Sequence, residues 1–379
     1  MTRSLIPRSV ALMTAVRHGH VQPRSVLPSL PVVAGTGLFA GAGLGLRALL
    51  GAGLGAVAWL LAALPVAAHG TVAQPPTDPV QVLLEWSFDP TIQIPLILLA
   101  AGYLAAVRHV NAAHLQNPVP WRRVAYFLAG VFAIELALQS PIEYYDTTLF
   151  SVHMVQHVLL TLVAAPLLAL GAPITLLLRL ATHDQRRRWI LPVLHSAPVR
   201  FLSFPVVAWL VFAGVMWGTH FSPIFNESLE NPLIHDLEHV AYLIAGLLFW
   251  WPAVGADPSP WRMPHPARLL YVFLQMPQNT FLAVAILAAP APLYRHYATL
   301  NLSWGSGPLA DQQLAGGFMW VAGDLIFLTA ILAIVASWMH HEERNQARVD
   351  AHVDAEMAEI RMRETRLADR LAGERPGES

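Results

Sequence analysis

Two pairs of histidines stand four residues apart in apolar segments of the sequence. His157 follows His153, and His239 follows His235. Residues four apart share one face of a helix, with Cβ atoms about 5–6 Å apart, so each pair can turn two imidazoles toward one point. Neutral imidazole is a ligand for copper and zinc. We predict that the four histidines form one metal site; interhelical hydrogen bonding is the alternative interpretation of either pair alone.

Further polar or soft side chains are expected at the same depth as the histidines. Imidazole combined with thioether sulfur, in a chain without thiolate, suits copper; sulfur favours Cu(I), whereas histidine alone favours Cu(II) or zinc. A methionine in a membrane helix is nevertheless more often a packing residue than a ligand. The additional candidates are Met154, Met216, Met319, His220, Glu238, Asp311 and Gln312.

The composition indicates that membrane helices must position these side chains. Of 379 residues, 55% are hydrophobic and 12% are charged, whereas a soluble protein carries about 25% charged residues. A span needs about 20 mostly apolar residues. Seven such runs follow residue 90, at 92–108, 124–140, 148–170, 201–219, 233–252, 268–289 and 313–338. The predicted fold is an all-α integral membrane protein, a seven-transmembrane-helix bundle preceded by a signal sequence or an extra N-terminal hydrophobic helix.

The rest of the chain divides around this bundle. Residues 1–68 form a basic N-terminal segment with an apolar run at 48–66, which is either a signal sequence or an anchor. Residues 69–91 are expected to be extracytoplasmic, 92–340 to form the membrane domain, and 341–379 to form a charged, amphipathic cytosolic tail. Cleavage after Ala68 would leave His69 at the new N-terminus, where its amine, amide and imidazole could chelate Cu(II).

The arginines predict the orientation. All 23 basic residues are arginine, and cytoplasmic loops collect positive charge. The loops after the first, third and fifth spans are arginine-rich, whereas of the alternate loops only the last contains an arginine, Arg295. We therefore expect a multi-pass membrane protein, with the C-terminus in the cytoplasm and the histidines toward the outer face.

Several classes of protein are excluded by composition. The sequence has no cysteine, which excludes disulfides, thiolate metal sites, iron–sulfur clusters and covalently attached c-type haem. The absence of lysine excludes a retinal Schiff base. A net charge of −1 gives no basic face for nucleic acid. In the sixth span, Met276-Pro277 predicts a kink, because proline removes a backbone hydrogen bond.

The order of motifs on the third, fifth and seventh spans resembles the multi-pass CtaG-type cytochrome c oxidase assembly factors. The resemblance covers residues 80–340. The motifs that carry it are His153-Met154-x-x-His157, His235-x-x-Glu238-His239 followed by Trp250-Trp251-Pro252, and Asp311-Gln312 followed by Met319-Trp320. The resemblance implies a seven-helix protein of the bacterial plasma membrane that acts in forming active haem–copper oxidase by handling copper. Oxidase subunits and an extracytoplasmic copper chaperone are the partners that it implies.

Three other functions stay open at this point, although we expect an assembly protein and no enzyme. His235-x-x-Glu238-His239 matches H-x-x-E-H, in which two histidines bind zinc and the glutamate is a general base, as in a membrane metallohydrolase. Facing histidines could instead ligate haem in a haem transporter. A copper transporter is the third alternative, although the cytoplasmic half of the sequence offers no matching ladder of ligands.

Overall fold

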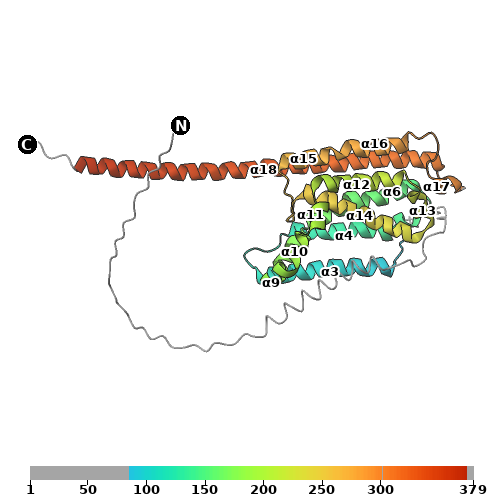
Figure 1. Ribbon diagram of the computed structural model, residues 1–379, viewed down its shortest axis with the longest axis horizontal. Helices are drawn as coiled ribbons and strands as arrows, with labels where there is room; N and C mark the ends of the chain where they lie inside the picture. Colours follow the sequence, from blue (N-terminus) through green and yellow to red (C-terminus); the bar gives the residue numbers. More distant parts are fainter. Residues whose placement is uncertain (1–84, 301, 374–379) are drawn as a thin grey trace, which may run out of the picture. The chain divides into compact units, whose positions relative to one another are not determined.

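The computed structural model describes residues 85–300 and 302–373, and every regular element in these ranges is a helix. The predicted run 48–66 and His69 lie outside the described residues. Figure 1 shows the main helices running side by side. The helices are α3 (Pro90–Ala113), α4 (Trp121–Gln139), α5 (Pro141–Tyr145), α6 (Phe150–Val158), η1 (Leu159–Ala164), α7 (Ala165–Leu170), α8 (Pro173–Leu180), α9 (His183–Gln185), η2 (Arg186–Ile190), α10 (Leu191–Leu194), α11 (Ala197–Leu202), α12 (Pro205–His220), α13 (Ile224–Glu230), α14 (Pro232–Val254), α15 (His265–Phe273), α16 (Gln275–Leu287), α17 (Arg295–Thr299) and α18 (Pro308–Gly373).

Six stretches of helix are long and apolar enough to cross a membrane, and a bent pair would make a seventh. The pair is α12 and α13, which meet at 68°. Helix α12 has 16 residues, about 24 Å at the rise of an α-helix, which is short of the ~30 Å hydrocarbon core. The six long stretches are Pro90–Ala113, Trp121–Tyr145, Phe150–Leu180, Pro232–Val254, His265–Leu287 and Pro308–Arg370. The predicted all-helical fold is thus confirmed, with six or seven candidate membrane spans.

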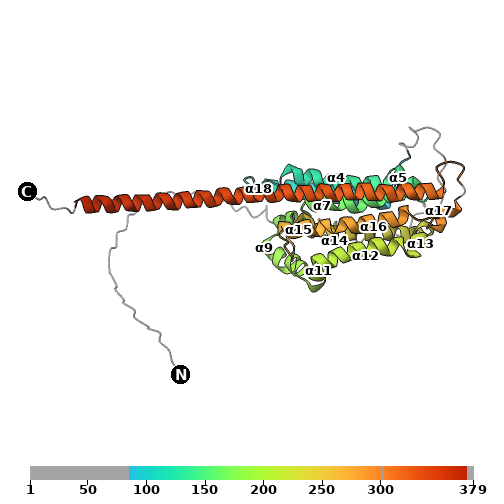
Figure 2. The same cartoon turned by 90° about the horizontal axis from the view of Figure 1, so that it is seen from above.

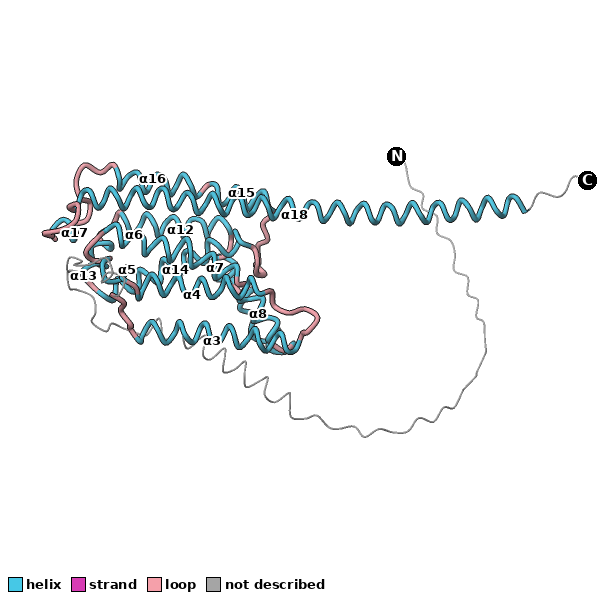
Figure 3. The backbone as a smooth tube through the Cα atoms, turned by 180° about the vertical axis from the view of Figure 1, so that it is seen from behind, coloured by secondary structure: helices cyan, strands magenta, loops and turns pink. Residues whose placement is uncertain are grey.

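The third stretch, from α6 through η1 to α7, lies between two hydrophobic clusters. Its side chains Phe150, Met154 and Leu162 belong to a cluster with α12, α14, α16 and α18. Leu160 and Ala164, on its other face, pack with α3 and α4. Figures 2 and 3 show the neighbouring helices from two further directions. Both histidine-bearing helices therefore belong to the tightly packed centre.

A π-helical turn interrupts this central stretch directly after His157. Over η1 the backbone takes a wider turn, and such turns are frequent at functional sites. The Trp250 indole donates to the Thr161 carbonyl at 2.9 Å, and the Thr161 hydroxyl donates to the His157 carbonyl at 2.6 Å. Gly246 of α14 lies against the same turn, since a Cβ there would come within 3.0 Å of the Thr161 carbonyl oxygen.

The sixth span is broken, as the proline predicted. Helix α15 ends at Phe273 and α16 begins at Gln275. A proline ring clashes with the carbonyl of the residue four positions before it. For Pro277 that residue is Phe273, so the break falls where the clash requires it.

The last helix is much longer than a membrane span. Helix α18 has 66 residues and runs without a break from the bundle into the charged tail, beyond the ends of the other helices (Figure 1). Val349, Val353, Met357 and Ile360 on this extension are exposed. The end of the seventh span and the start of the tail are therefore a single element.

Candidate metal centre

The structure brings the four predicted histidines together. His153 and His157 lie on α6, and His235 and His239 lie on the first turns of α14. Ring centroids are 5.4 Å apart between His153 and His235 and 6.2 Å apart between His157 and His239. All four are buried, with exposed fractions of 0–6%. The two pairs thus face each other at one depth, near the ends of α6 and α14 where both helices begin.

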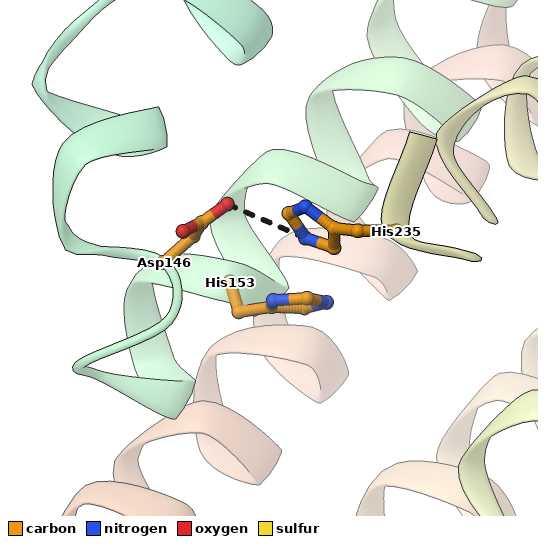
Figure 4. Close-up of side chains that lie close together, drawn as sticks. All are labelled: Asp146, His153 and His235. Atoms are coloured by element: carbon orange, nitrogen blue, oxygen red, sulfur yellow. Dashed lines mark ion pairs between the residues drawn. The ribbon is translucent and has the colours of Figure 1, made fainter. Parts of the chain in front are cut away.

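Carboxylates complete this cluster. The Asp146 carboxylate lies 3.5 Å from Nε2 of His235, and Figure 4 shows Asp146, His153 and His235 turned toward one another. Glu238 Oε2 lies 3.9 Å from His153 Nε2. Three overlapping groups could hold an ion, with their ligand atoms within 4.8 Å of one another: Asp146, His153 and His235; His153, His157 and Glu238; and Glu143, Asp146 and His239.

Hydrogen bonds outside the cluster hold its supports in place. The Asp311 carboxylate accepts from the Ser151 hydroxyl at 2.5 Å and from its backbone N–H at 3.3 Å, so it caps the start of α6. The Tyr297 hydroxyl donates to the Asp146 carbonyl at 2.6 Å. The Asn231 side chain accepts from the Leu233 N–H and caps α14. Both helices and the Asp146 loop are therefore fixed before any ion binds.

The donor atoms of this cluster fit a metal ion. Among the described residues, no hydrogen bond reaches either ring nitrogen of His153 or His157. A buried polar group without a partner costs about 1–3 kcal/mol, and a cation would satisfy these nitrogens. Burial raises the pKa of the Asp146 carboxyl well above its usual range, because the charged form loses its hydration. A bound cation would favour the ionised carboxylate and offset that cost.

A second set of donors, rich in sulfur, lies beside the histidines. A cavity of about 30 Å³ is lined by His157, His220, Met154, Met216 and Met319. His220 Nδ1 lies 2.7 Å from the Met216 carbonyl, which can only accept, so Nδ1 carries the proton. Nε2, 3.4 Å from the Met154 sulfur, then keeps its lone pair. A ring held through its other nitrogen is typical of a metal-ligating histidine.

The other predicted candidates have different partners. Asp311 is bound to Ser151 at the start of α6, as described above. The Gln312 side chain accepts from the Leu293 N–H at 2.7 Å and donates to the Ile286 carbonyl at 3.2 Å, so it ties down the loop after α16. These two residues position the site from outside the histidine cluster. Glu238 lies inside the cluster.

Three residues of the centre escaped the sequence analysis. Asp146 and Glu143 were not predicted as ligands, yet they complete two of the three ligand groups. Tyr242 stacks on His157 with ring centroids 4.0 Å apart. A usable signal existed, because Tyr242 comes three residues after His239 and shares its helix face.

Comparisons with known proteins identify the family of the chain. Residues 101–341 match the family described as cytochrome c oxidase caa3 assembly factor. Uncharacterized proteins of Mycobacterium bovis and Mycobacterium tuberculosis are each 33% identical over 293 residues, and one of Mycobacterium leprae is 32% identical. The matched residues make up 76% of this chain and 44% of each relative, so the chain spans less than half of their length. No solved structure matches.

The family match covers the whole of the histidine cluster and runs from within α3 to the membrane part of α18. It exceeds half of the chain, and it was predicted from the motifs on the third, fifth and seventh spans. The chain therefore belongs to the family of cytochrome c oxidase caa3 assembly factors.

Proposed function

We propose that this protein binds copper at the cluster of His153, His157, His235 and His239 and passes it on during assembly of the oxidase. The observation that carries the proposal is the position of the imidazole nitrogens on α6, which accept and donate no hydrogen bond within the described residues, opposite the histidine pair on α14. The carboxylates Glu143, Asp146 and Glu238 lie beside them. Copper is here a cargo. Its acceptor would be an oxidase subunit, and an extracytoplasmic chaperone would supply it.

The two kinds of donor support copper over zinc. Histidine nitrogen and carboxylate oxygen in the histidine cluster would bind Cu(II) or Cu(I). The sulfur-lined cavity beside this cluster favours Cu(I). Because His157 contributes to both places, an ion could move between them by exchanging one ligand at a time. Such exchange suits a protein that must release its metal.

The orientation expected from the arginines supports this function. Arginines gather at the opposite end of the bundle, so the positive-inside rule turns the histidines to the outer side. Asp146 lies in the loop before α6, at the end of the cluster that faces this surface. Its buried carboxylate would bind the cation beside His235. The plasma membrane of a bacterium is the corresponding location.

The zinc metallohydrolase remains the second candidate, because Glu238 belongs to one of the three ligand groups. In a hydrolase its carboxylate would activate a water molecule. Here it lies nearest His153 of the other pair, which makes it a charge-balancing neighbour of a four-histidine site.

The metal content of the oxidase isolated from complemented cells tests the proposal. Cells lacking this gene would be complemented with wild type, with His153→Ala/His157→Ala, or with His340→Ala/His341→Ala, whose exposed histidines lie in α18 away from the centre. We expect the α6 variant to yield oxidase with normal haem and reduced copper, and the control pair to yield fully metallated enzyme. Oxidase with full copper content in the α6 variant would overturn the proposal.

A further inference from the structure

A cavity of about 740 Å³ lies at the end of the bundle opposite to the histidines. Its walls come from α8, from η2, from the loop between α3 and α4, and from the end of α14 with the following loop, as shown by Thr175, Arg186, Asn117 and Pro252. The volume falls in the range of small-ligand sites, about 300–1,000 Å³. The copper-handling function uses none of these residues.

The lining of this cavity is strongly basic. Arg179, Arg186, Arg262 and Arg268 contribute to it, with Asp257 as its one acid. In the described part of the chain, no ion pair joins any of the four arginines to a carboxylate. The cavity therefore concentrates positive charge that the protein itself leaves uncompensated.

The one acid in the lining already accepts hydrogen bonds from the protein. The Asp257 carboxylate accepts from the N–H groups of Ile174 and Thr175, at 3.0 and 2.6 Å, and from the Thr175 hydroxyl at 2.6 Å. It thereby caps the start of α8 from a distant loop. Burial also raises the pKa of Asp257, because the charged form loses its hydration. The arginines keep their attraction for an anion from outside.

The cavity walls are held rigidly. Arg268 Nε donates to the Ala253 carbonyl at 2.7 Å, and the guanidinium also bonds Val254, at the end of α14. Gly255 follows with a φ of 61°, a conformation that favours glycine. Arg179 donates to the Asn117 carbonyl across the cavity. Little ordering would remain to be done when a ligand binds.

We propose that this cavity binds a phosphate group, carried by an anionic phospholipid or free in solution. The guanidinium fork matches phosphate oxygens with two parallel hydrogen bonds, and basic pockets between membrane helices on the cytoplasmic side bind anionic headgroups. Leu178 and Met263 also line the cavity and supply an apolar wall for a glycerol or acyl stem.

Native mass spectrometry of the full chain in detergent tests this proposal. The probes are dioleoyl phosphatidylglycerol, dioleoylglycerol, which lacks the phosphate, and inorganic phosphate, which lacks the lipid. The test variant is Arg186→Gln/Arg262→Gln. The control variant is Arg187→Gln/Arg188→Gln, which removes the same charge from exposed residues of η2 that do not line the cavity. The arginines replaced in the two variants are all exposed, so circular dichroism should show that both variants fold.

We expect phosphatidylglycerol to bind wild type, the test variant to bind it about tenfold more weakly, and the control variant to change by less than about threefold. Displacement of the lipid by inorganic phosphate would identify the phosphate group alone as the ligand, whereas its failure would identify the lipid headgroup. Equal weakening in both variants, or equal binding of dioleoylglycerol, would overturn the proposal. Neither result depends on copper.

Discussion

The imidazole rings of His153 and His235 lie with their centroids 5.4 Å apart, although they belong to different helices, α6 and α14. The Asp146 carboxylate reaches the same pair from the preceding loop (Figure 4). The donor set therefore does not belong to either helix alone. Any change that separates α6 from α14 should weaken metal binding even when every ligand is kept.

Replacing Gly246 tests this dependence on helix packing. In Gly246→Ala the new Cβ would come within 3.0 Å of both Ala165 Cβ and the Thr161 carbonyl oxygen. We expect a loss of about 1–3 kcal/mol, typical of overpacking, and weaker copper binding. Gly214→Ala is the matched control, since nothing lies within 4 Å of its Cβ, and alanine favours a helix by up to about 1 kcal/mol. Thermal unfolding and copper titration in detergent measure both effects; identical behaviour of the two variants would contradict the assignment.

The π-helical turn should depend on Trp250. In Trp250→Phe the Thr161 carbonyl loses its indole donor, and a buried acceptor without a partner costs about 1–3 kcal/mol. For a protein of this size the midpoint of thermal unfolding should fall by roughly 1–4 °C. Trp121→Phe, at a tryptophan that is 73% exposed, should leave the midpoint unchanged. An unchanged midpoint in Trp250→Phe would mean that the turn does not need this bond.

The sequence was sufficient to predict the histidines of the centre, because spacing along a helix fixes which side chains share a face. It also placed both pairs at one depth, since α6 and α14 run in the same direction. The break at Phe273 followed from Pro277. Each of these predictions depends on geometry within one helix or on one chemical property.

Other features depend on contacts between distant segments. The π-helical turn at η1 follows from packing against Gly246 and Trp250 of α14, and the apolar pattern of 159–164 is compatible with an ordinary helix. The acids Glu143 and Asp146 lie before the third span in sequence, and only the packed fold brings them to the histidines. The fourth span, predicted at 201–219, is shorter in the structure: α12 runs from Pro205 to His220, and the chain then bends by 68° into α13.

Glu238→Gln separates copper handling from hydrolysis. Glutamine keeps the shape of the side chain and removes its charge beside His153. Copper handling predicts that the variant still retains copper and still supports oxidase assembly, because the four histidines remain. A metallohydrolase predicts normal metal binding with complete loss of function, since the general base is gone. Complementation of a deletion strain, with metal content measured in parallel, distinguishes the two.

The sulfur-lined cavity makes a prediction about oxidation state. Met154→Leu conserves volume, and such swaps usually cost less than about 1.5 kcal/mol of stability. We expect Cu(I) affinity to fall by about tenfold, the lower end of what the loss of a supporting group costs a metal site, and Cu(II) affinity to change little. Met339→Leu, on the exposed face of α18, is the control. Equal Cu(I) affinity in wild type and Met154→Leu would remove this methionine from the site.

The central claim is that both histidine pairs bind one copper ion, and metal content tests it most directly. Purified protein would be equilibrated anaerobically with Cu(I), Cu(II) or Zn(II), and retained metal measured by mass spectrometry. Wild type is compared with His153→Ala/His157→Ala, His235→Ala/His239→Ala and the control His340→Ala/His341→Ala. We predict about one copper per chain in wild type and control, and its loss in either cluster variant, because each helix supplies half of the imidazoles. Retention of copper by both cluster variants, or binding of zinc alone through the α14 pair, would contradict the account.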